Sequence, residues 1–321
     1  MSDFINKENC SDLKEFYIPY RKTLDLPTNV TFGLEVEFKM DPFNDSYKSN
    51  FIDEDNAARV FMKDIGYDYN YDVECEINDH IELVSPVLTD NDKTWEELDN
   101  ILTFIKNNDG YYSGKCGAHI HVGKQIINDI DSWLNFFKLW YIFEDDIFRF
   151  TNGENYKLRQ NAQSNSRKID NICRIIINDY NLLKEIDVSY LTKNKYNCIN
   201  FPASLDCKNP DELLMIKGNF KDNNISNTIE FRSPNGTINS VIWQENVNFF
   251  TKLMLSCANK NLDKERLEYL YNNKSLANVD DLVSFVFEDE FDKKCFLRQY
   301  YKDFSNPDFK FSDERSMPFW K

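Results

Sequence analysis

The sequence of 321 residues lacks the features of several common protein classes. No apolar run approaches the roughly 20 residues that a membrane-spanning helix needs, and the mean hydropathy is −0.60. The first residues show no basic start followed by an apolar stretch, so no secretory signal is predicted and we expect a cytoplasmic protein. The eight cysteines form no CxxC pair, which favours buried, reduced thiols over a zinc ribbon or a disulfide framework.

Positive charge is also scarce. Lys and Arg number 38 against 54 Asp and Glu, which gives a formal charge of −16 and a pI near 4.7. Because binding to a phosphate backbone requires clustered cations, we expect no nucleic-acid partner, and the lack of apolar runs predicts no membrane partner. Neither GxxxxGK[ST] nor GxGxxG occurs, so no nucleotide is held by a P-loop or a Rossmann turn.

The sequence does contain ample apolar area, with 41% hydrophobic and 15% aromatic residues, which predicts a folded chain. Polar–apolar alternation predicts strands at 30–40, 69–77, 80–87, 118–122, 196–201 and 228–232. Helical spacing predicts helices at 53–65, 94–105, 131–150, 241–259 and in the last sixty residues. No regular strand–helix–strand rhythm is present, so the pattern favours an α+β fold with a mainly antiparallel sheet.

Two of the predicted helices carry more specific signals. Thr94 followed by Glu97 is typical of a capping box, so Thr94 is predicted to cap the helix that follows it. The aromatic residues of 133–143 are predicted to form a helix core rather than a platform for a nucleobase. Residues 151–168 are polar and are predicted to form an irregular loop.

Four predicted strands carry polar side chains two residues apart, and such residues point to the same face of a strand. These side chains are Glu35 and Glu37, Glu82, His119 and His121, and Glu230 and Arg232. Each pattern alone is typical of a solvated strand face, but two of only three histidines in the chain occupy one pair. If the strands share one sheet, their carboxylates repel one another unless a cation neutralises them. Carboxylate oxygens favour Mg²⁺ or Mn²⁺ over zinc.

The order of these motifs is more specific than any one of them. It runs GLEVEF at 33–38, ELVSP at 82–86, GAHIHVG at 117–123, a strand at 196–201, and TIEFR at 228–232 with Gly236 and Thr237. This series resembles the amidoligase family, which is similar to an outlying branch of the superfamily of glutamine synthetase and glutamate–cysteine ligase. The resemblance covers about residues 30–260. We therefore predict an N-terminal arm at 1–29, a catalytic domain at 30–260, and a helical extension at 261–321 packed on it.

The resemblance implies a curved antiparallel sheet that forms a half-barrel, with helices on the convex face and an ATP site with Mg²⁺ or Mn²⁺ on the concave face. It implies an ATP-dependent ligase that condenses a carboxylate with an amine through an acyl phosphate. The co-substrates would be amino acids, peptides or other small molecules. Their identity and the oligomeric state are left open by the sequence.

The resemblance also assigns roles to residues. The implied metal ligands are Glu35, Glu37, Glu74, Glu82, His119 and Glu230. The implied nucleotide ligands are His119, His121, Arg159, Arg167 and Lys195. The implied catalytic residues are Glu37, Glu230 and Arg232, the arginine facing the transferred phosphoryl group. Which histidine binds metal and which binds phosphate stays open.

Two other functions remain open from the residues. A metal-dependent oxygenase or hydrolase would use His119 and His121 with a third strong ligand and no nucleotide. A catalytically degenerate binding module of the same fold is the other, because Cys75 and Glu76 follow Glu74 where the family has Gly-Ser. Cys116 lies beside the histidine strand, but no base is placed to activate it as a nucleophile.

Overall fold

The computed structural model describes residues 13, 16–39, 71–76, 80–107, 110–112, 116–127, 129–153, 166–178, 196–200 and 228–302. For residues 73–76 and for His80 it describes the backbone alone. The helix predicted at 53–65, most of the loop predicted at 151–168 and the chain after residue 302 lie outside the described residues.

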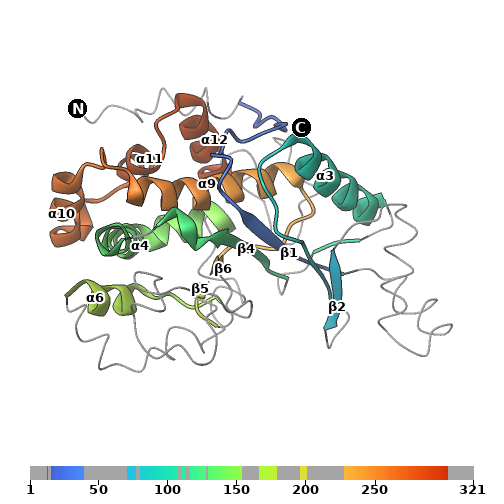
Figure 1. Cartoon of the computed structure of the whole chain (residues 1–321), viewed down its shortest axis with the longest axis horizontal. Coiled ribbons are helices and arrows are strands. Elements are labelled where there is room, and N and C mark those ends of the chain that lie inside the picture. The colour runs from blue at the N-terminus through green and yellow to red at the C-terminus, as the bar shows by residue number, and fades with distance from the viewer. Residues whose placement is uncertain are drawn as a thin grey trace.

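One six-stranded sheet runs through the described part of the chain, in the order β2-β3-β1-β4-β6-β5 (Figure 1). Its strands are β1 (Phe32–Phe38), β2 (Asp72–Glu76), β3 (His80–Val84), β4 (Ala118–Gly123), β5 (Ile199–Asn200) and β6 (Thr228–Phe231). Every neighbouring pair is antiparallel. Five of these strands fall within segments predicted to be extended, β4 runs one residue beyond its prediction, and β5 is much shorter than its prediction.

The helices of the described residues lie at both ends of the molecule, with α3 near β2 and α10 at the opposite end (Figure 1). They are α3 (Asp92–Asn107), α4 (Ile130–Asn152), α6 (Asp170–Asn178), α9 (Ser240–Ala258), α10 (Lys264–Asn272), α11 (Val279–Val286) and α12 (Glu290–Tyr300), with short 3₁₀ turns η2 (Lys124–Ile126) and η5 (Lys274–Leu276). Helix α6 was not predicted, although Ile172, Cys173 and Ile176 have helical spacing. No helix of the described residues combines the length and apolarity needed to cross a bilayer.

The apolar face of the sheet packs against α4 and α9. Phe231 of β6 stacks on Phe250 of α9, with ring centroids 4.2 Å apart, and on Trp140 of α4 at 5.8 Å. At the start of β1, Phe32 stacks on Trp95 of α3 at 5.4 Å. These buried aromatics confirm that the aromatic run of α4 belongs to the core. The α+β fold with an antiparallel sheet and helices on one face is thereby confirmed.

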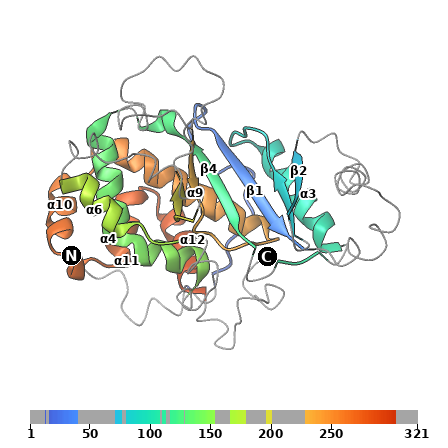
Figure 2. The ribbon, with the colours of Figure 1, turned by 90° about the horizontal axis from the view of Figure 1, so that it is seen from below.

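The C-terminal helices continue this core. Phe296 of α12 stacks on Phe150 of α4 at 4.3 Å, and Phe285 of α11 lies 6.1 Å from Phe143 of α4. Helices α10 and α11 lie with α4 at one end of the molecule, and β2 and α3 lie at the other (Figures 1 and 2). Helices α11 and α12 therefore pack on the same core as α4, whereas the predicted division of the chain into an arm, a catalytic domain and an extension stays a prediction.

A buried ion cluster joins the N-terminal segment to α9 and α12. One guanidinium nitrogen of Arg21 lies 2.6 Å from Glu245, and the other lies 2.7 Å from Asp292. Lys252 also pairs with Asp292. Burial raises the pKa of Glu245 to about 7, against the attraction of Arg21, which lowers it. The cluster holds residues just before β1 against two helices from the far end of the sequence.

Helix α3 begins earlier than predicted. Asn91 Oδ1 accepts a hydrogen bond from the backbone N–H of Thr94 at 3.0 Å, as an N-cap side chain does. Thr94 lies inside the first turn and is buried. The prediction that Thr94 caps this helix was wrong because Asn91, three residues earlier, is itself a strong capping residue and takes that role.

The cysteine prediction can be checked at five positions. Cys116, Cys173, Cys198, Cys257 and Cys295 are all buried, with no disulfide among them. Burial raises the pKa of the Cys173 and Cys198 thiols well above the ordinary value. Buried, reduced thiols are confirmed for these five.

Candidate functional site

The register of the sheet brings the polar residues of four strands to one face. In β1 the partly exposed odd-numbered residues alternate with buried even-numbered ones. Directly opposite residues of an antiparallel pair share a face. The opposed pairs are Glu35 with His119, Glu37 with Glu82, and His121 with Glu230. The predicted polar faces therefore belong to one continuous surface.

Glu35 lies at the centre of this surface. Its Oε2 is 2.6 Å from Nδ1 of His119, and its Oε1 is 2.7 Å from Nε2 of His121. Burial acts to raise the pKa of Glu35, but hydrogen bonds from the two imidazoles outweigh it and hold that pKa well below its usual range. Glu35 is thus an ionised carboxylate fixed by two rings, and Nδ1 of His121 lies 3.2 Å from the hydroxyl of Thr228.

Glu230 and Arg232 form the second part of the surface. The Glu230 side chain is only 6% exposed, and it accepts a hydrogen bond from Asn200 Nδ2 at 2.8 Å. Arg232 pairs with its other oxygen and lies 3.4 Å from Nδ1 of His119. The Nε–H of Arg232 is buried and has no acceptor among the residues that the structure describes. Arg232 therefore lies beside Glu230 and His119, and its Nε–H group donates no hydrogen bond to a described residue.

Glu37 depends on a glycine for its position. Its Oε2 accepts a hydrogen bond from the backbone N–H of Gly117 at 2.6 Å, and its Oε1 lies 3.6 Å from Nε2 of His119. A Cβ atom at Gly117 would lie 2.7 Å from that Nε2 and 3.2 Å from Oε1 of Glu37. Because Gly117 has no side chain, the carboxylate of Glu37 and the imidazole of His119 can lie close to each other.

Two overlapping sets of side chains are close enough to hold a cation. One is Glu35, Glu82 and His119, and the other is Glu35, His121 and Glu230, with the ligand atoms of each set within 4.8 Å of one another. Glu35 is common to both, so its two oxygens can serve two neighbouring positions. Two carboxylates and one imidazole in each set suit Mg²⁺ or Mn²⁺ better than a thiolate-rich or imidazole-rich zinc site.

The other predicted ligands either do not belong to these two sets or have side chains that the structure does not describe. Glu37 belongs to neither set among the described residues. Glu74 pairs with Glu82 across β2 and β3, but its side chain is not described. Arg167 is exposed beside β5, with its guanidinium carbon 5.8 Å from the ring centroid of Tyr196. Arg159 and Lys195 lie outside the described residues.

Three contributors to the surface were not predicted from the sequence. Thr228 lies two residues before Glu230 in the same strand, so the period of two was a signal that could have found it. Asn200 opposes Glu230 only through the register of β5 with β6, which no sequence pattern reveals. The hydrogen bond from Gly117 to Glu37 depends on the backbone and left no side-chain signal.

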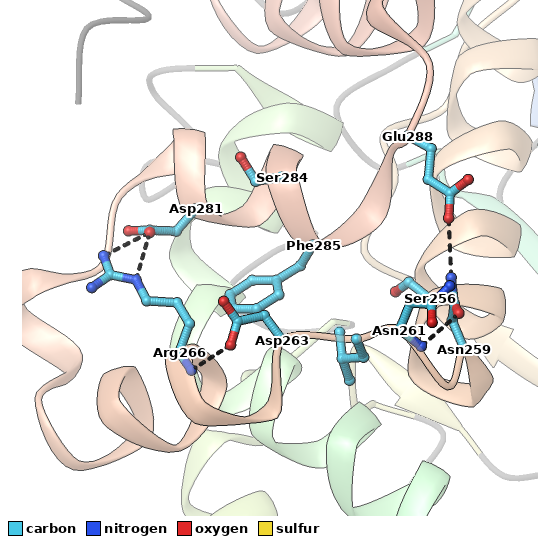
Figure 3. Close-up of a pocket in the computed structure, with 10 residues that line it drawn as sticks. Ser256, Asn259, Asn261, Asp263, Arg266, Asp281, Ser284, Phe285 and Glu288 are labelled. Atoms are coloured by element: carbon cyan, nitrogen blue, oxygen red, sulfur yellow. Dashed lines mark hydrogen bonds and ion pairs between the residues drawn. The ribbon is translucent and has the colours of Figure 1, made fainter. Parts of the chain in front are cut away.

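Two cavities lie in different parts of the fold. One, of about 350 Å³, opens beside the cluster and is lined in part by Glu35 and His121. The other, of about 280 Å³, lies between α9, α10 and α11 (Figure 3). Contacts within its lining engage the charged residues, since Arg266 lies 2.7 Å from Asp281 and Asn259 donates to Glu288 at 3.1 Å. Of these two cavities, the first is the one that borders residues of the cation-compatible sets.

The fold and the surface define an α+β protein with a cluster of carboxylates and imidazoles, close enough to hold a cation, on one face of an antiparallel sheet. Residues 52–254 match the family model described as "Putative amidoligase enzyme". The chain belongs to this amidoligase family, and this membership supports a ligase-type enzyme. The match contains Glu82, both histidines of β4, and Glu230 with Arg232, whereas β1 precedes it.

The other comparisons add little to the family match. No curated protein matches the chain. Among solved structures, one described as "Crystal structure of novel glutamine synthase homolog" aligns with a TM-score of 0.43 and 12% identity. That alignment covers 88% of this chain and 68% of the other.

Proposed function

We propose that the protein is an ATP-dependent ligase that joins a carboxylate to an amine through an acyl phosphate. The observation that carries this proposal is the pair of cation-compatible sets that share Glu35, next to Arg232 with its unused buried donor. A surface of this kind combines what phosphoryl transfer needs, which is metal ligands and a cation for the charge on the moving group. Membership of the amidoligase family supports the same reaction class.

The residues present fit the divalent ion that this reaction requires. Each of the two sets brings two carboxylates within 4.8 Å of each other, and like charges at this spacing favour a bound cation. We propose that Glu35, Glu82 and Glu230 hold Mg²⁺ or Mn²⁺ together with His119 and His121. A bound divalent ion would offset the negative charge of the ATP phosphates. Glu37 and Glu74, which were predicted as further ligands, remain proposed on the family pattern alone.

The reaction has two steps that balance. A carboxylate oxygen of the first co-substrate attacks the γ-phosphorus of ATP, and the bond to the β-phosphate oxygen breaks to release ADP. The amine nitrogen of the second co-substrate then attacks the acyl carbon, phosphate leaves with the electron pair of the C–O bond, and the amine loses a proton. No reactant other than ATP, the two co-substrates and solvent is consumed.

Arg232 is the side chain that we assign to the phosphoryl group. Its planar guanidinium can donate paired hydrogen bonds to phosphoryl oxygens. Glu230 binds one end of the guanidinium and is itself held by Asn200, so the direction of the arginine is fixed. Glu37 completes the proposed catalytic set. His119, His121, Arg159, Arg167 and Lys195 remain the proposed nucleotide ligands.

The geometry favours this reading over an oxygenase or hydrolase. A metal held by both His119 and His121 would need the two rings to converge on one point. Each of the two cation-compatible sets among the described residues instead contains one histidine and two carboxylates. The two rings bind different oxygens of Glu35, which separates them. Oxygen-rich sets of this kind favour a hard ion and a phosphate ligand.

Thermal unfolding and phosphate release test the proposal together. A ligand that binds the folded state at 100 times its Kd stabilises it by about 2.7 kcal/mol, so Mg²⁺ with ATP should raise the Tm of the wild-type protein. Glu35→Gln should abolish this rise, and Arg232→Lys should retain binding but lose phosphate release. Glu268→Gln, which removes the surface partner of Lys138, is the matched control and should behave as the wild type.

The outcomes separate the competing functions. Release of phosphate that requires both a carboxylate and an amine supports the ligase. A rise in Tm with Mg²⁺ and ATP but no phosphate release with any pair of co-substrates would instead favour a degenerate binding module. Absence of any response to ATP, with Glu35→Gln indistinguishable from the wild type, would refute the proposal.

A further inference from the structure

The cavity of about 350 Å³ opens directly beside the cation site. It lies where β1 begins, and its lining joins residues of β1 to the segment after β3 and to β4 and β6. Glu35 and His121 belong both to this lining and to one cation-compatible set. The cavity is therefore continuous with the proposed reaction centre. Its size falls at the small end of the roughly 300–1,000 Å³ that ligand pockets span.

Part of this cavity is open because Gly33, one of its lining residues, has no side chain. Gly33 lies on the same face of β1 as Glu35, two residues away, so a larger residue there would project beside the carboxylate. A Cβ atom at Gly33 would lie 3.6 Å from Cβ of His121 and 3.7 Å from Oγ of Ser85, which are ordinary contacts. Alanine is thus tolerated at this position, whereas a branched side chain would occupy the cavity.

The charge of the lining limits what can bind. Among the described lining residues only Glu35 and His121 can ionise, and the others are glycine, apolar residues, or the neutral polar residues Thr31, Ser85, Gln125 and Thr228. No Lys or Arg is part of this described lining, and Arg232 lies instead at Glu230 and His119. An anionic group placed here would lose water and lie against the carboxylate of Glu35, with no Lys or Arg of the described lining to pair with it, which is unfavourable.

We infer that this cavity is the subsite for the amine co-substrate. It accepts a neutral-bodied amine, by which we mean one whose part other than the amino group is compact and uncharged; an acidic-bodied amine carries an acidic group there. The inference rests on the proposed function. The phosphoryl group and the carboxylate that it activates belong on the side of Arg232, which contacts Glu230 and His119. The amine belongs on the opposite side of the cluster, where the lining is neutral and Glu35 is the nearest charged neighbour. Amines with an acidic or phosphorylated body are excluded by the same lining.

A panel of amines tests the inference on the full-length protein. Phosphate release is measured with Mg²⁺, ATP and a fixed pool of N-acetyl amino acids as carboxylate donors. The neutral-bodied amines are n-butylamine and leucinamide, and the acidic-bodied ones are glutamate and taurine. We expect the neutral-bodied amines to support phosphate release and the acidic-bodied ones to give less than a tenth of that rate.

Substitutions at Gly33 locate the effect in the cavity. Gly33→Val should raise the KM for the neutral-bodied amines at least tenfold and leave the KM for ATP within twofold. Gly33→Ala is the conservative control and should change neither by more than about threefold. Val87→Lys introduces a cation at a lining residue that is 78% exposed, so folding is unaffected. It should raise the KM for these ammonium-bearing amines, and Leu276→Lys, which alters an exposed residue outside the cavity, should not.

Failure of the inference can be told from failure of the proposed function. Phosphate release that depends on acidic-bodied amines, or a KM for neutral-bodied amines that Gly33→Val and Val87→Lys both leave unchanged, overturns the inference while the ligase stands. If no amine supports phosphate release, binding of the same amines is measured by their effect on the Tm. Protection by the neutral-bodied amines that Gly33→Val abolishes supports the subsite, and its absence overturns both proposals.

Discussion

The buried carboxylate Glu245 gives a prediction whose size follows from the structure. Glu245 is 2% exposed and pairs with Arg21, which also pairs with Asp292. Burial raises the pKa of Glu245 from 4.5 to about 7. A pKa difference of this size between the folded and unfolded states corresponds to about 3 kcal/mol.

The direction in which stability changes with pH depends on whether the folded or the unfolded state binds the proton of Glu245 more tightly. Because the pKa of Glu245 is higher in the folded than in the unfolded protein, the folded state holds the proton more tightly. Its contribution to stability is fully present below pH 4.5 and is lost as the pH rises through about 7. About 2.5 kcal/mol of the loss falls between pH 5 and pH 8, with a slope of at most about 1.4 kcal/mol per pH unit.

Glu245→Gln isolates this contribution. Glutamine has the shape of the protonated carboxyl and still offers Arg21 an acceptor, but it does not titrate. The free energy of unfolding in urea is measured for both proteins at several values between pH 5 and pH 8. Every other titrating group is common to both and cancels in the difference. We expect the variant to gain about 2.5 kcal/mol relative to the wild type over this range.

The control removes a carboxylate from the surface. Glu268→Gln changes a side chain that is 53% exposed and pairs with Lys138, and an exposed pair contributes less than about 1 kcal/mol. A difference between Glu245→Gln and the wild type that stays constant with pH, or that runs in the opposite direction, would refute the reasoning. Either result would mean that Glu245 is ionised in the folded protein throughout this range.

Three further predictions concern the site, the core and the thiols. Gly117→Ala should reduce phosphate release at least tenfold with little change in the urea midpoint, because its Cβ would press on the imidazole of His119; a fully active variant would show that this approach is unimportant. Phe250→Ala should lower the free energy of unfolding by about 3–5 kcal/mol, and Phe291→Ala, which alters a residue 40% exposed, by much less; equal losses would contradict the packing described. Alkylation mapped by mass spectrometry should modify Cys173 and Cys198 only after unfolding in urea, because both thiols are buried and burial raises their pKa. Modification of either in the folded protein would show that it is accessible.

The sequence was sufficient to predict the polar face of the sheet. Glu35 and Glu37 alternate with buried apolar residues, and so do the histidines of β4, so the period of two assigned each side chain to a face. The long apolar helices α4 and α9 were also predicted to within two residues, because their hydrophobic faces repeat over five turns or more.

What the sequence could not provide was the pairing of the strands. β1 lies between β3 and β4, although these three are separated by long stretches of chain. The position of Asn200 against Glu230 follows from one short pairing of β5 with β6. The first turn of α3 was misplaced because two capping residues, Asn91 and Thr94, compete within one turn, and only the geometry of their hydrogen bond decides between them.

The central position of β1 has a consequence for the order in which the protein can be made. β1 is synthesised first among the described strands, yet both of its edges are covered by strands that follow it in the chain. β4, which covers the second of these edges, begins about eighty residues after the end of β1. On a ribosome that adds about 5–20 residues per second, the nascent β1 would wait roughly four seconds or more for that partner. During this interval its alternating carboxylates keep an otherwise apolar strand solvated, and charges of this kind oppose edge-to-edge association with other chains. Glu35 and Glu37 would thus oppose association of the nascent chain with other chains before they take part in the site of the folded protein.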